Sequence, residues 1–288
     1  MGNTGGAHCA TETMSSTSNS PATASGKSSS NGAPLLELRG ITKRFGPVQA
    51  LTHINIEIPP GQVTALAGDN GAGKSVTIKT IAGLWPPDEG EILWEGKPVH
   101  FHGPRDAEAA GITTIYQDLA LADNLDIVQN MFLGHEPLRH GLLDEATMEL
   151  TAKATLKELS VRTIRSIRQP VASLSGGQRQ SVAVAKAVMA KAKLVIMDEP
   201  TAALGVSQTR TVLSLIKRLA SQGVAVLVVS HNLNDVFAVA DRIVVLYLGN
   251  MVAQAPASEF DPSSVVDYMT TGRSGRSAGN GAAAGKEG

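Results

Sequence analysis

Residues 68–75 read Gly-Asp-Asn-Gly-Ala-Gly-Lys-Ser, which is the complete G-x-x-x-x-G-K-[ST] pattern of a phosphate-binding loop. Glycine has no side chain and tolerates positive φ, so successive backbone N–H groups of such a loop can turn inward around an anion. Lys74 can reach the β- and γ-phosphates of a nucleotide, and the Ser75 hydroxyl can bind Mg²⁺. The pattern therefore predicts a site for a nucleotide polyphosphate.

The residues on both sides of the loop favour the same interpretation. Val63 to Ala67 is a short apolar run typical of a strand, and Ile78, Ile81 and Ala82 recur at helical spacing. A helix that begins at the loop adds the positive end of its dipole to the anion site. We expect nucleotide contacts from the loop and the first helical turn, namely from Gly68, Asp69, Asn70, Gly71, Ala72, Gly73, Lys74, Ser75 and Val76.

Composition limits the class of protein. The chain has 288 residues, 42% of them hydrophobic, and a formal net charge of −1. This balance offers no whole-chain electrostatic reason to bind nucleic acid or an anionic membrane. The only cysteine is Cys9, so neither disulfides nor a thiolate-bound metal support the fold. No apolar run is long enough to span a bilayer and no secretion signal is visible, so we expect a cytoplasmic protein.

Composition also divides the chain into three parts. Residues 1–34 and 273–288 consist mainly of small and polar residues, and we expect both to be disordered tails. Residues 35–272 have no internal repeat or long linker, and we interpret them as one domain. Within this domain, strands expected at Leu35–Gly40, Ile54–Ile58 and Glu91–Trp94 predict a small antiparallel sheet. An amphipathic helix is expected over Asp144–Leu159.

The second half of the domain predicts an α/β fold. Leu194–Met197 and Val224–Val229 are continuously apolar, as parallel strands buried on both faces are. A helical stripe between them completes a β-α-β unit and consists of Val212, Leu215, Ile216 and Leu219. Earlier, the loop Leu174–Gln178 precedes the helical segment Arg179–Lys191. Its Leu-Ser-Gly-Gly-Gln sequence can place N–H groups around an anion, although Ser-Gly-Gly alone is more often an ordinary turn.

Three chemically suited side chains follow these apolar strands. Asp198 and Glu199 come at the carboxyl end of Leu194–Met197, where an α/β sheet usually binds its ligand. Asp198 can hold hydrated Mg²⁺, and Glu199 can orient or deprotonate an attacking water. His231 follows the next strand and can hydrogen-bond a γ-phosphate. The alternatives are a helix cap formed by the acids and a purely structural histidine.

In this order, the motifs resemble the ATP-binding subunit of an ABC transporter, and the resemblance covers nearly all of residues 35–272. It implies a P-loop NTPase domain with a mostly parallel core sheet, a small antiparallel β subdomain and a helical arm at about 118–175. It also implies that Phe45 stacks on adenine, with core packing as the alternative. Gln117 is implied to touch Mg²⁺ and to link the ATP site to a transmembrane partner.

The resemblance further implies how subunits work together. The residues Ser175, Gly176, Gly177 and Gln178 would contact ATP held by a second ATP-binding subunit, either a copy of this chain or a paralogue. Two ATP molecules would then be bound between two chains, and loss of the γ-phosphate would let the chains part. The arm would dock a permease loop. Met131, Phe132 and Leu133 are candidate exposed contacts, and packing inside the arm is an equally good interpretation.

Several stretches are similar to monosaccharide importers, namely Asn130–Gly134, Glu199–Val206 and Ser230–Leu233 with Val236-Phe237 and Asp241-Arg242. That resemblance implies permease subunits, a sugar-binding protein outside the membrane, and a peripheral position on the cytoplasmic face of the plasma membrane. Gly205 departs from the family pattern, which has Asp at this position in a loop that communicates across the dimer. The resemblance therefore does not indicate how the two ATP sites of this protein would signal to each other.

Other classes of protein remain as alternatives. A soluble ABC-type ATPase that acts mechanically on another complex usually adds a coiled coil or a second ATPase domain, and neither is visible here. A GTPase or small-molecule kinase would leave the Leu174–Gln178 loop without a role, and no guanine-reading Asn-Lys-x-Asp motif is present. A regulatory module without turnover would not need Glu199 and His231.

Overall fold

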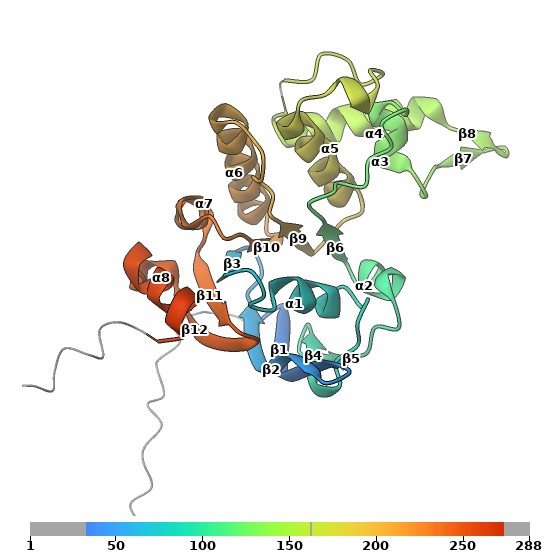
Figure 1. The fold of residues 1–288 in the computed structure, drawn as a ribbon. Coiled ribbons are helices and arrows are strands. Elements are labelled where there is room, and N and C mark those ends of the chain that lie inside the picture. Colours follow the sequence, from blue (N-terminus) through green and yellow to red (C-terminus); the bar gives the residue numbers. More distant parts are fainter. Residues whose placement is uncertain (1–32, 162, 274–288) are drawn as a thin grey trace, which may run out of the picture. The chain divides into compact units, whose positions relative to one another are not determined.

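The computed structural model describes residues 33–161 and 163–273. The tails expected at 1–34 and 273–288 lie almost entirely outside the described residues, and so does Cys9. The described residues belong to one unit of two large sheets and surrounding helices (Figure 1). In this part of the chain, no helix combines the length and apolar character that crossing a membrane requires.

The central sheet has six strands and carries the expected parallel core. Across the sheet they are β12 (Asn250–Pro256), β11 (Arg242–Tyr247), β3 (Val63–Gly68), β10 (Ala225–Val229), β9 (Leu194–Asp198) and β6 (Ile112–Ile115). Only the edge strand β12 runs antiparallel to its neighbour. Along β9, Leu194 and Ile196 belong to one apolar cluster and Val195 and Met197 to another. Alternate side chains of a strand point to opposite faces, so this sheet is buried on both faces, as the continuous apolar runs predict.

The small antiparallel sheet is confirmed. Its strands are, in order across the sheet, β2 (Val48–Ile58), β1 (Leu36–Phe45), β4 (Glu89–Trp94) and β5 (Lys97–Val99). Strand β1 is longer than expected and reaches Phe45. One face of this sheet packs on α1 (Lys74–Ile81) and on the central sheet, with Ile54, Ile78 and Leu66 in one cluster. The phosphate-binding loop therefore begins between two layers that hold it in place.

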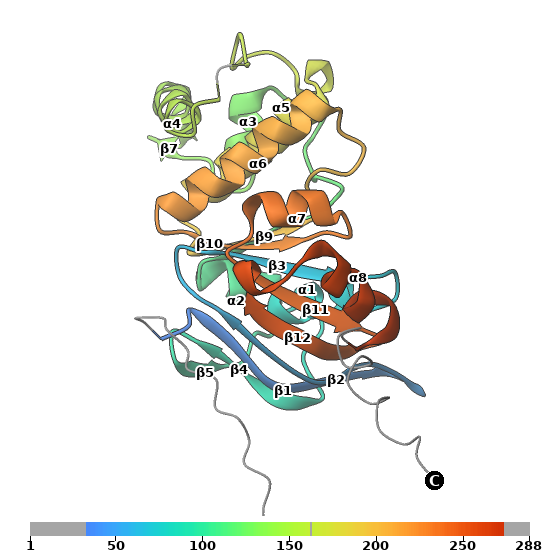
Figure 2. The ribbon, with the colours of Figure 1, turned by 90° about the vertical axis from the view of Figure 1, so that its left-hand side faces the viewer.

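Helices cover the opposite face of the central sheet. Figure 2 shows α6 (Val206–Ser221) and α7 (Leu233–Val239) on one side of the sheet and the antiparallel sheet on the other. The buried residues of α6 are the four of the predicted stripe, Val212, Leu215, Ile216 and Leu219. They pack in one cluster with α5 (Gly176–Met189). Two shorter helices, α2 (Pro104–Ala109) and α8 (Pro262–Thr271), and the 3-10 turn η2 (Ala257–Glu259) complete this part of the unit.

The arm packs on α5 and consists of α3 (Ile127–Phe132), a hairpin of β7 (Leu138–Arg139) and β8 (Leu142–Leu143), α4 (Glu145–Glu158) and the 3-10 turn η1 (Val171–Ser173). Helix α4 confirms the expected helix, with Asp144 and Leu159 as its caps. Met131 and Phe132 are buried inside the arm, so of the two interpretations packing inside the arm is confirmed for them and exposure is wrong. Only Leu133 of the three is exposed. Apolar side chains on the inner side of α3 complete the arm's core because α3 lies against α5.

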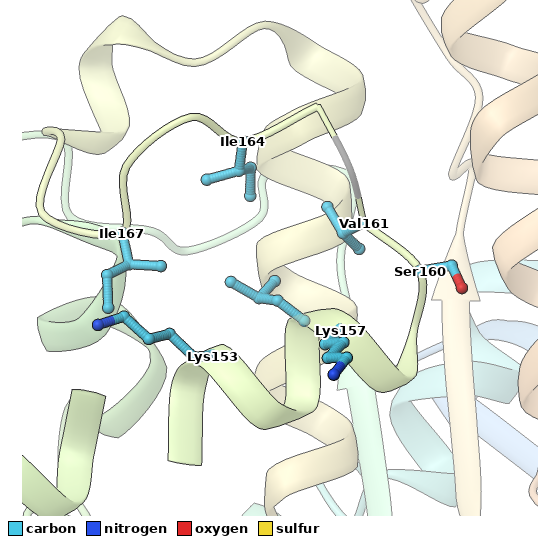
Figure 3. A pocket seen from close by; sticks show the side chains of 7 residues that line it. Lys153, Lys157, Ser160, Val161, Ile164 and Ile167 are labelled. Carbon is cyan, nitrogen blue, oxygen red and sulfur yellow. The ribbon is translucent and has the colours of Figure 1, made fainter. Parts of the chain in front are cut away.

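A pocket of about 430 Å³ lies within the arm. Figure 3 shows Val161, Ile164 and Ile167 beside α4, which contributes Lys153 and Lys157. None of its seven lining residues belongs to a sequence motif described above. This pocket is a feature of arm packing and is separate from the motif residues.

Candidate nucleotide-binding and catalytic site

Four motif segments leave the central sheet at the same edge. Strand β3 leads into the phosphate-binding loop, β10 into His231, β9 into Glu199 and β6 into Gln117. The register places Val229 of β10 beside Leu66 and beside Asp198, and Ile115 of β6 beside Met197. These strands are parallel and adjacent, so their carboxyl ends form one crevice. The structure thus brings together four motifs that are up to 163 positions apart in the sequence (231 − 68).

The phosphate-binding loop has the backbone that its glycines allow. Gly71 and Gly73 have φ angles of 81° and 101°, in the left-handed region where a side chain is strained. At Gly68 the reason is space, because a Cβ atom there would lie 2.7 Å from the carbonyl oxygen of Leu246. Gly73 is the N-cap of α1, so the helix begins directly at the loop and its positive end faces it. This cradle without side-chain bulk fits a polyphosphate chain.

Lys74 is the first residue of α1 and is buried. Its Nζ donates hydrogen bonds to the carbonyl oxygens of Gly68, at 2.8 Å, and Asp69, at 3.0 Å. An ammonium carries three protons, so one remains for an oxygen of a ligand. Ser75 on the next position is exposed. Among the other predicted contacts, Asp69 and Asn70 are exposed, Ala72 is buried and Val76 is half-buried.

Glu199 and His231 are in direct contact. His231 Nδ1 lies 2.8 Å from Glu199 Oε1, and the backbone N–H of His231 donates to the same oxygen at 3.2 Å. The Ser230 hydroxyl donates to Glu199 Oε2 at 3.4 Å. The φ angle of Glu199 is 48°, a strained conformation for a residue with a side chain, and such strain is common at functional sites. The carboxylate is therefore oriented by the end of the neighbouring strand, and Ser230 is a partner that no sequence motif indicated.

Asp198 has an unfavourable environment for a lone negative charge. Burial raises the pKa of its carboxyl and the Glu199 charge raises it further, whereas Lys74 and Lys79 act in the opposite direction. The two adjacent carboxylates repel each other, and the exposed Ser75 hydroxyl follows the phosphate-binding loop at the carboxyl end of β3 in the same sheet; carboxylate and hydroxyl oxygens are donors that Mg²⁺ prefers. These residues therefore fit a divalent cation.

Gln117 follows β6 and is exposed. Burial raises the pKa of the preceding Tyr116, and the charge of Asp198 contributes to that shift. Gln117 thus belongs to a segment within electrostatic range of the acids, in agreement with the pairing of β6 and β9.

The Leu174–Gln178 loop does not follow a strand of the central sheet, and it makes its contacts with other segments. Ser175 is the N-cap of α5, and its backbone N–H donates to Gln178 Oε1 at 2.9 Å. Gln178 Nε2 donates in turn to the carbonyl oxygen of Thr163 at 2.7 Å. Gly176 and Gly177 face Leu204 and Gln208, at the start of α6. The contacts of this loop therefore run to the arm and to the start of α6, and Ser175 itself is exposed.

Phe45 ends β1 and is part of an aromatic pair that sequence reasoning missed. Its partner is Trp85, in the turn between α1 and β4. A tryptophan in a proline-rich turn carries no motif, so the only available signal was its rarity, since the chain has two tryptophans.

Comparison with known proteins identifies the family. The model of the ABC transporter family matches residues 51–202, a segment that includes the phosphate-binding loop, Ser175 and Glu199. The chain belongs to the ABC transporter family. This cassette is 48% identical over 244 residues to the fructose import ATP-binding protein FrcA of Rhizobium meliloti, covering 82% of this chain and 94% of that protein. It is 46% identical over 237 residues to the xylose/arabinose import ATP-binding protein XylG of Sulfolobus acidocaldarius, again covering 82% and 94%.

A third relative is longer. The ribose import ATP-binding protein RbsA 1 of Rubrobacter xylanophilus is 43% identical over 224 residues, which are 78% of this chain and 44% of that protein. The cassette therefore spans about half the length of this relative.

Solved structures of ABC cassettes have the same fold. The ADP conformation of MJ1267, an ATP-binding cassette of an ABC transporter, superimposes with a TM-score of 0.72 at 25% identity, covering 83% of this chain and 96% of that one. A dimeric post-hydrolysis state of the cassette MJ0796 bound to ADP and Pi gives a TM-score of 0.64 at 26% identity, covering 77% and 98%. Both comparisons confirm the α/β cassette fold with its antiparallel sheet and helices.

Proposed function

We propose that this cassette is the ATP-binding and hydrolysing subunit that energises a permease for uptake of a monosaccharide. The observation that carries the proposal is the 48% identity to a fructose import ATP-binding protein, over 94% of that protein's length. The names of two further relatives, for xylose/arabinose and ribose import, indicate the same substrate class. The crevice at the strand ends supplies the side chains that such an ATPase needs.

The phosphate-binding loop is proposed to hold ATP. Backbone N–H groups of the loop and the N-terminus of α1 would bind phosphate oxygens, and Lys74 would add a positive charge. Phe45 is proposed to stack on the base, since the residue is 40% exposed at the end of β1. The full proposed nucleotide set is Phe45, Gly68, Asp69, Asn70, Gly71, Ala72, Gly73, Lys74, Ser75, Val76 and Gln117, with Ser175, Gly176, Gly177 and Gln178 acting from a second subunit.

Ser75, Gln117 and Asp198 are proposed to hold Mg²⁺, whose chemistry is to neutralise charge on the transferring phosphoryl group. The Ser75 hydroxyl and the Gln117 amide oxygen are neutral donors, and Asp198 supplies the negative charge. Because burial and the Glu199 charge disfavour the ionised form of Asp198, a bound cation would stabilise that form.

Glu199 is proposed to orient the attacking water and accept its proton, and His231 to hydrogen-bond the γ-phosphate. Glu199 Oε1 is held by both Nδ1 and N–H of His231, so the carboxylate cannot swing away from the strand ends. His231 is exposed, which leaves its Nε2 edge available to a ligand. One ring nitrogen lies against the base and the other is open to the phosphate; donating to both at once requires an imidazolium, which carries a proton on each nitrogen.

A second ATP-binding subunit, either a copy or a paralogue, is proposed to complete each site. Ser175 is exposed at the N-terminus of the 14-residue helix α5 and makes its local contacts with the arm and α6. We propose that a loop so placed offers its N–H groups to a nucleotide on another chain. The dimeric form of the related cassette MJ0796 supports this arrangement.

The permease is proposed to dock in a groove between the central sheet and the arm. The groove has a volume of about 910 Å³, and its lining includes the half-buried Leu119 and Leu121, with the buried Met131 and Phe132 behind them. Its lining contains two cationic side chains, Arg105 and Lys186, and the single acid Glu108, so a partly apolar segment with an acidic residue fits it. Leu119 follows Gln117 by two positions, which connects the groove to the ATP site. The cassette would then lie on the cytoplasmic face of the membrane.

Uptake by cells tests the function. Deletion of the gene is expected to abolish uptake of at least one labelled monosaccharide among fructose, xylose, arabinose and ribose. The wild-type gene should restore uptake and the Glu199→Gln variant should not. Unchanged uptake of every sugar, together with sedimentation of the protein with ribosomes instead of membranes, would favour a soluble mechanical ATPase.

A further inference from the structure

Two aromatic rings meet beside the phosphate-binding helix. Phe45 and Trp85 have ring centroids 4.8 Å apart and planes at 72°. This edge-on arrangement is one of the favourable geometries of an aromatic pair. Trp85 is half-buried, whereas Phe45 keeps 40% of its surface exposed. Trp85 therefore covers part of Phe45 and leaves the rest accessible.

Each ring also has a lysine near it. Lys79 Nζ lies 4.4 Å from the centroid of the Trp85 ring, and Lys43 Nζ lies 5.6 Å from that of Phe45. Both distances are within the range of cation–π attraction. Lys79 belongs to α1, whose first residue is Lys74. Trp85 therefore contacts the same helix that begins at the phosphate-binding loop.

Polar contacts hold the turn of Trp85 against β1. Lys43 Nζ donates to the carbonyl oxygen of Pro86 at 2.7 Å and pairs with Asp88 Oδ1 at 3.0 Å. The backbone N–H of Arg44 donates to Asp88 Oδ2 at 2.6 Å, and the N–H of Asp88 donates to the carbonyl oxygen of Thr42 at 2.9 Å. These four bonds set the distance between the two ring-bearing segments.

We infer that Trp85 is a positioning residue for recognition of the nucleotide base. It holds the Phe45 ring in one orientation before the nucleotide arrives, so less side-chain freedom is lost on binding. Its contact with Lys79 connects the base-binding ring to the helix that binds phosphates. The inference rests on the proposed role of Phe45 and adds a residue that acts through Phe45 without touching the phosphates.

Binding of two ligands tests this role. One is a non-hydrolysable ATP analogue, and the other is inorganic tripolyphosphate, which has three phosphates and no base. Trp85→Ala is expected to weaken binding of the analogue about three- to ten-fold and to leave the affinity for tripolyphosphate unchanged. Trp85→Phe, which keeps an aromatic edge, should bind both nearly as the wild type does. A merely structural defect would weaken both ligands together.

The double variant separates this inference from the proposed function. Phe45→Leu should weaken the analogue selectively, and Phe45→Leu with Trp85→Ala should be no weaker than Phe45→Leu alone. The positioning role would be overturned if the losses of affinity from the two substitutions added up in the double variant, or if Trp85→Ala bound the analogue and tripolyphosphate equally less tightly. A Phe45→Leu variant with full affinity for the analogue would instead overturn the proposed role of Phe45 itself.

Fluorescence provides a second measurement that does not depend on Trp85→Ala folding well. The other tryptophan, Trp94, is 6% exposed in β4. The analogue is expected to change the emission of Trp94→Phe, which keeps Trp85, and to leave that of Trp85→Phe unchanged. If the emission of Trp94→Phe stayed the same and that of Trp85→Phe changed, the environment of Trp85 would not depend on bound nucleotide, and the inference would be overturned.

Discussion

Gly176 and Leu204 are packed so closely that a Cβ atom on the glycine would lie 2.7 Å from Leu204 Cδ2. Gly176 belongs to the loop proposed to act on the partner subunit's nucleotide. Leu204 lies five positions after Glu199, the proposed base of the chain's own site (204 − 199). The close packing therefore places the proposed partner-facing loop against the segment that follows the proposed base.

Gly176→Ala is expected to reduce ATP turnover because the added methyl displaces Leu204. The matched variant Gly176→Ala with Leu204→Ala removes the clash and should restore part of the activity. Steady-state hydrolysis of ATP by the wild type and these two variants measures this. A double variant as inactive as Gly176→Ala would indicate that the methyl obstructs the nucleotide instead.

Glu199→Gln should bind ATP normally and lose nearly all turnover, about 10²- to 10⁴-fold, because an amide cannot accept the proton from water. ATP would then hold the subunits together, since the γ-phosphate is not lost. Sedimentation with ATP and turnover assays measure both effects. Nucleotide-dependent association with unchanged turnover would contradict the role of Glu199.

Lys74→Ala is expected to weaken ATP binding about 10- to 100-fold, which is the effect of losing a charge-assisted hydrogen bond. The loop carbonyls of Gly68 and Asp69 would also lose their donor. Lys74→Arg, which keeps the charge, is the control for charge alone. An ATP titration curve unchanged by Lys74→Ala would reject this role.

Asp88 predicts a pH-dependent stability. The backbone N–H of Arg44 and the Lys43 ammonium, which both donate to its carboxylate, lower its pKa. A folded-state pKa below the ordinary value contributes stability that is present at neutral pH and is lost as the pH falls through the lowered pKa. Asp88→Asn should therefore melt below the wild type at pH 7, and the difference should shrink below about pH 4. A melting difference that is the same at all pH values would contradict this.

Gly68→Ala should lower the free energy of unfolding by about 1–3 kcal/mol, because the new Cβ has no space beside Leu246 and Ala72. Gly205→Ala is the control, since Gly205 has a negative φ of −72° and no atom within 4 Å of the added Cβ. The free energy of unfolding of Gly205→Ala should lie within about 0.5 kcal/mol of the wild-type value or slightly above it. Denaturant titrations measure the free energy of unfolding of both variants. If Gly68→Ala and Gly205→Ala lose the same amount of stability, the packing argument is contradicted.

The sequence alone determined much of the fold. Apolar runs and periodicity are local, so they predicted β3, β9 and β10, the helix α4 and the four buried residues of α6. The glycines of residues 68–75 also predicted the form of the loop, because positive φ and close backbone approach are properties of single residues. The roles of the site residues in binding and catalysis stay predictions.

Only the tertiary structure decided which of these elements are neighbours. The contact of Glu199 with His231, the burial of Met131 and Phe132 in the arm, and the pairing of Phe45 with Trp85 each join segments that no periodic pattern relates. Such contacts depend on how strands cross over and on which helix face meets a partner. These are properties of the whole packed chain, and a local stretch of sequence does not contain them.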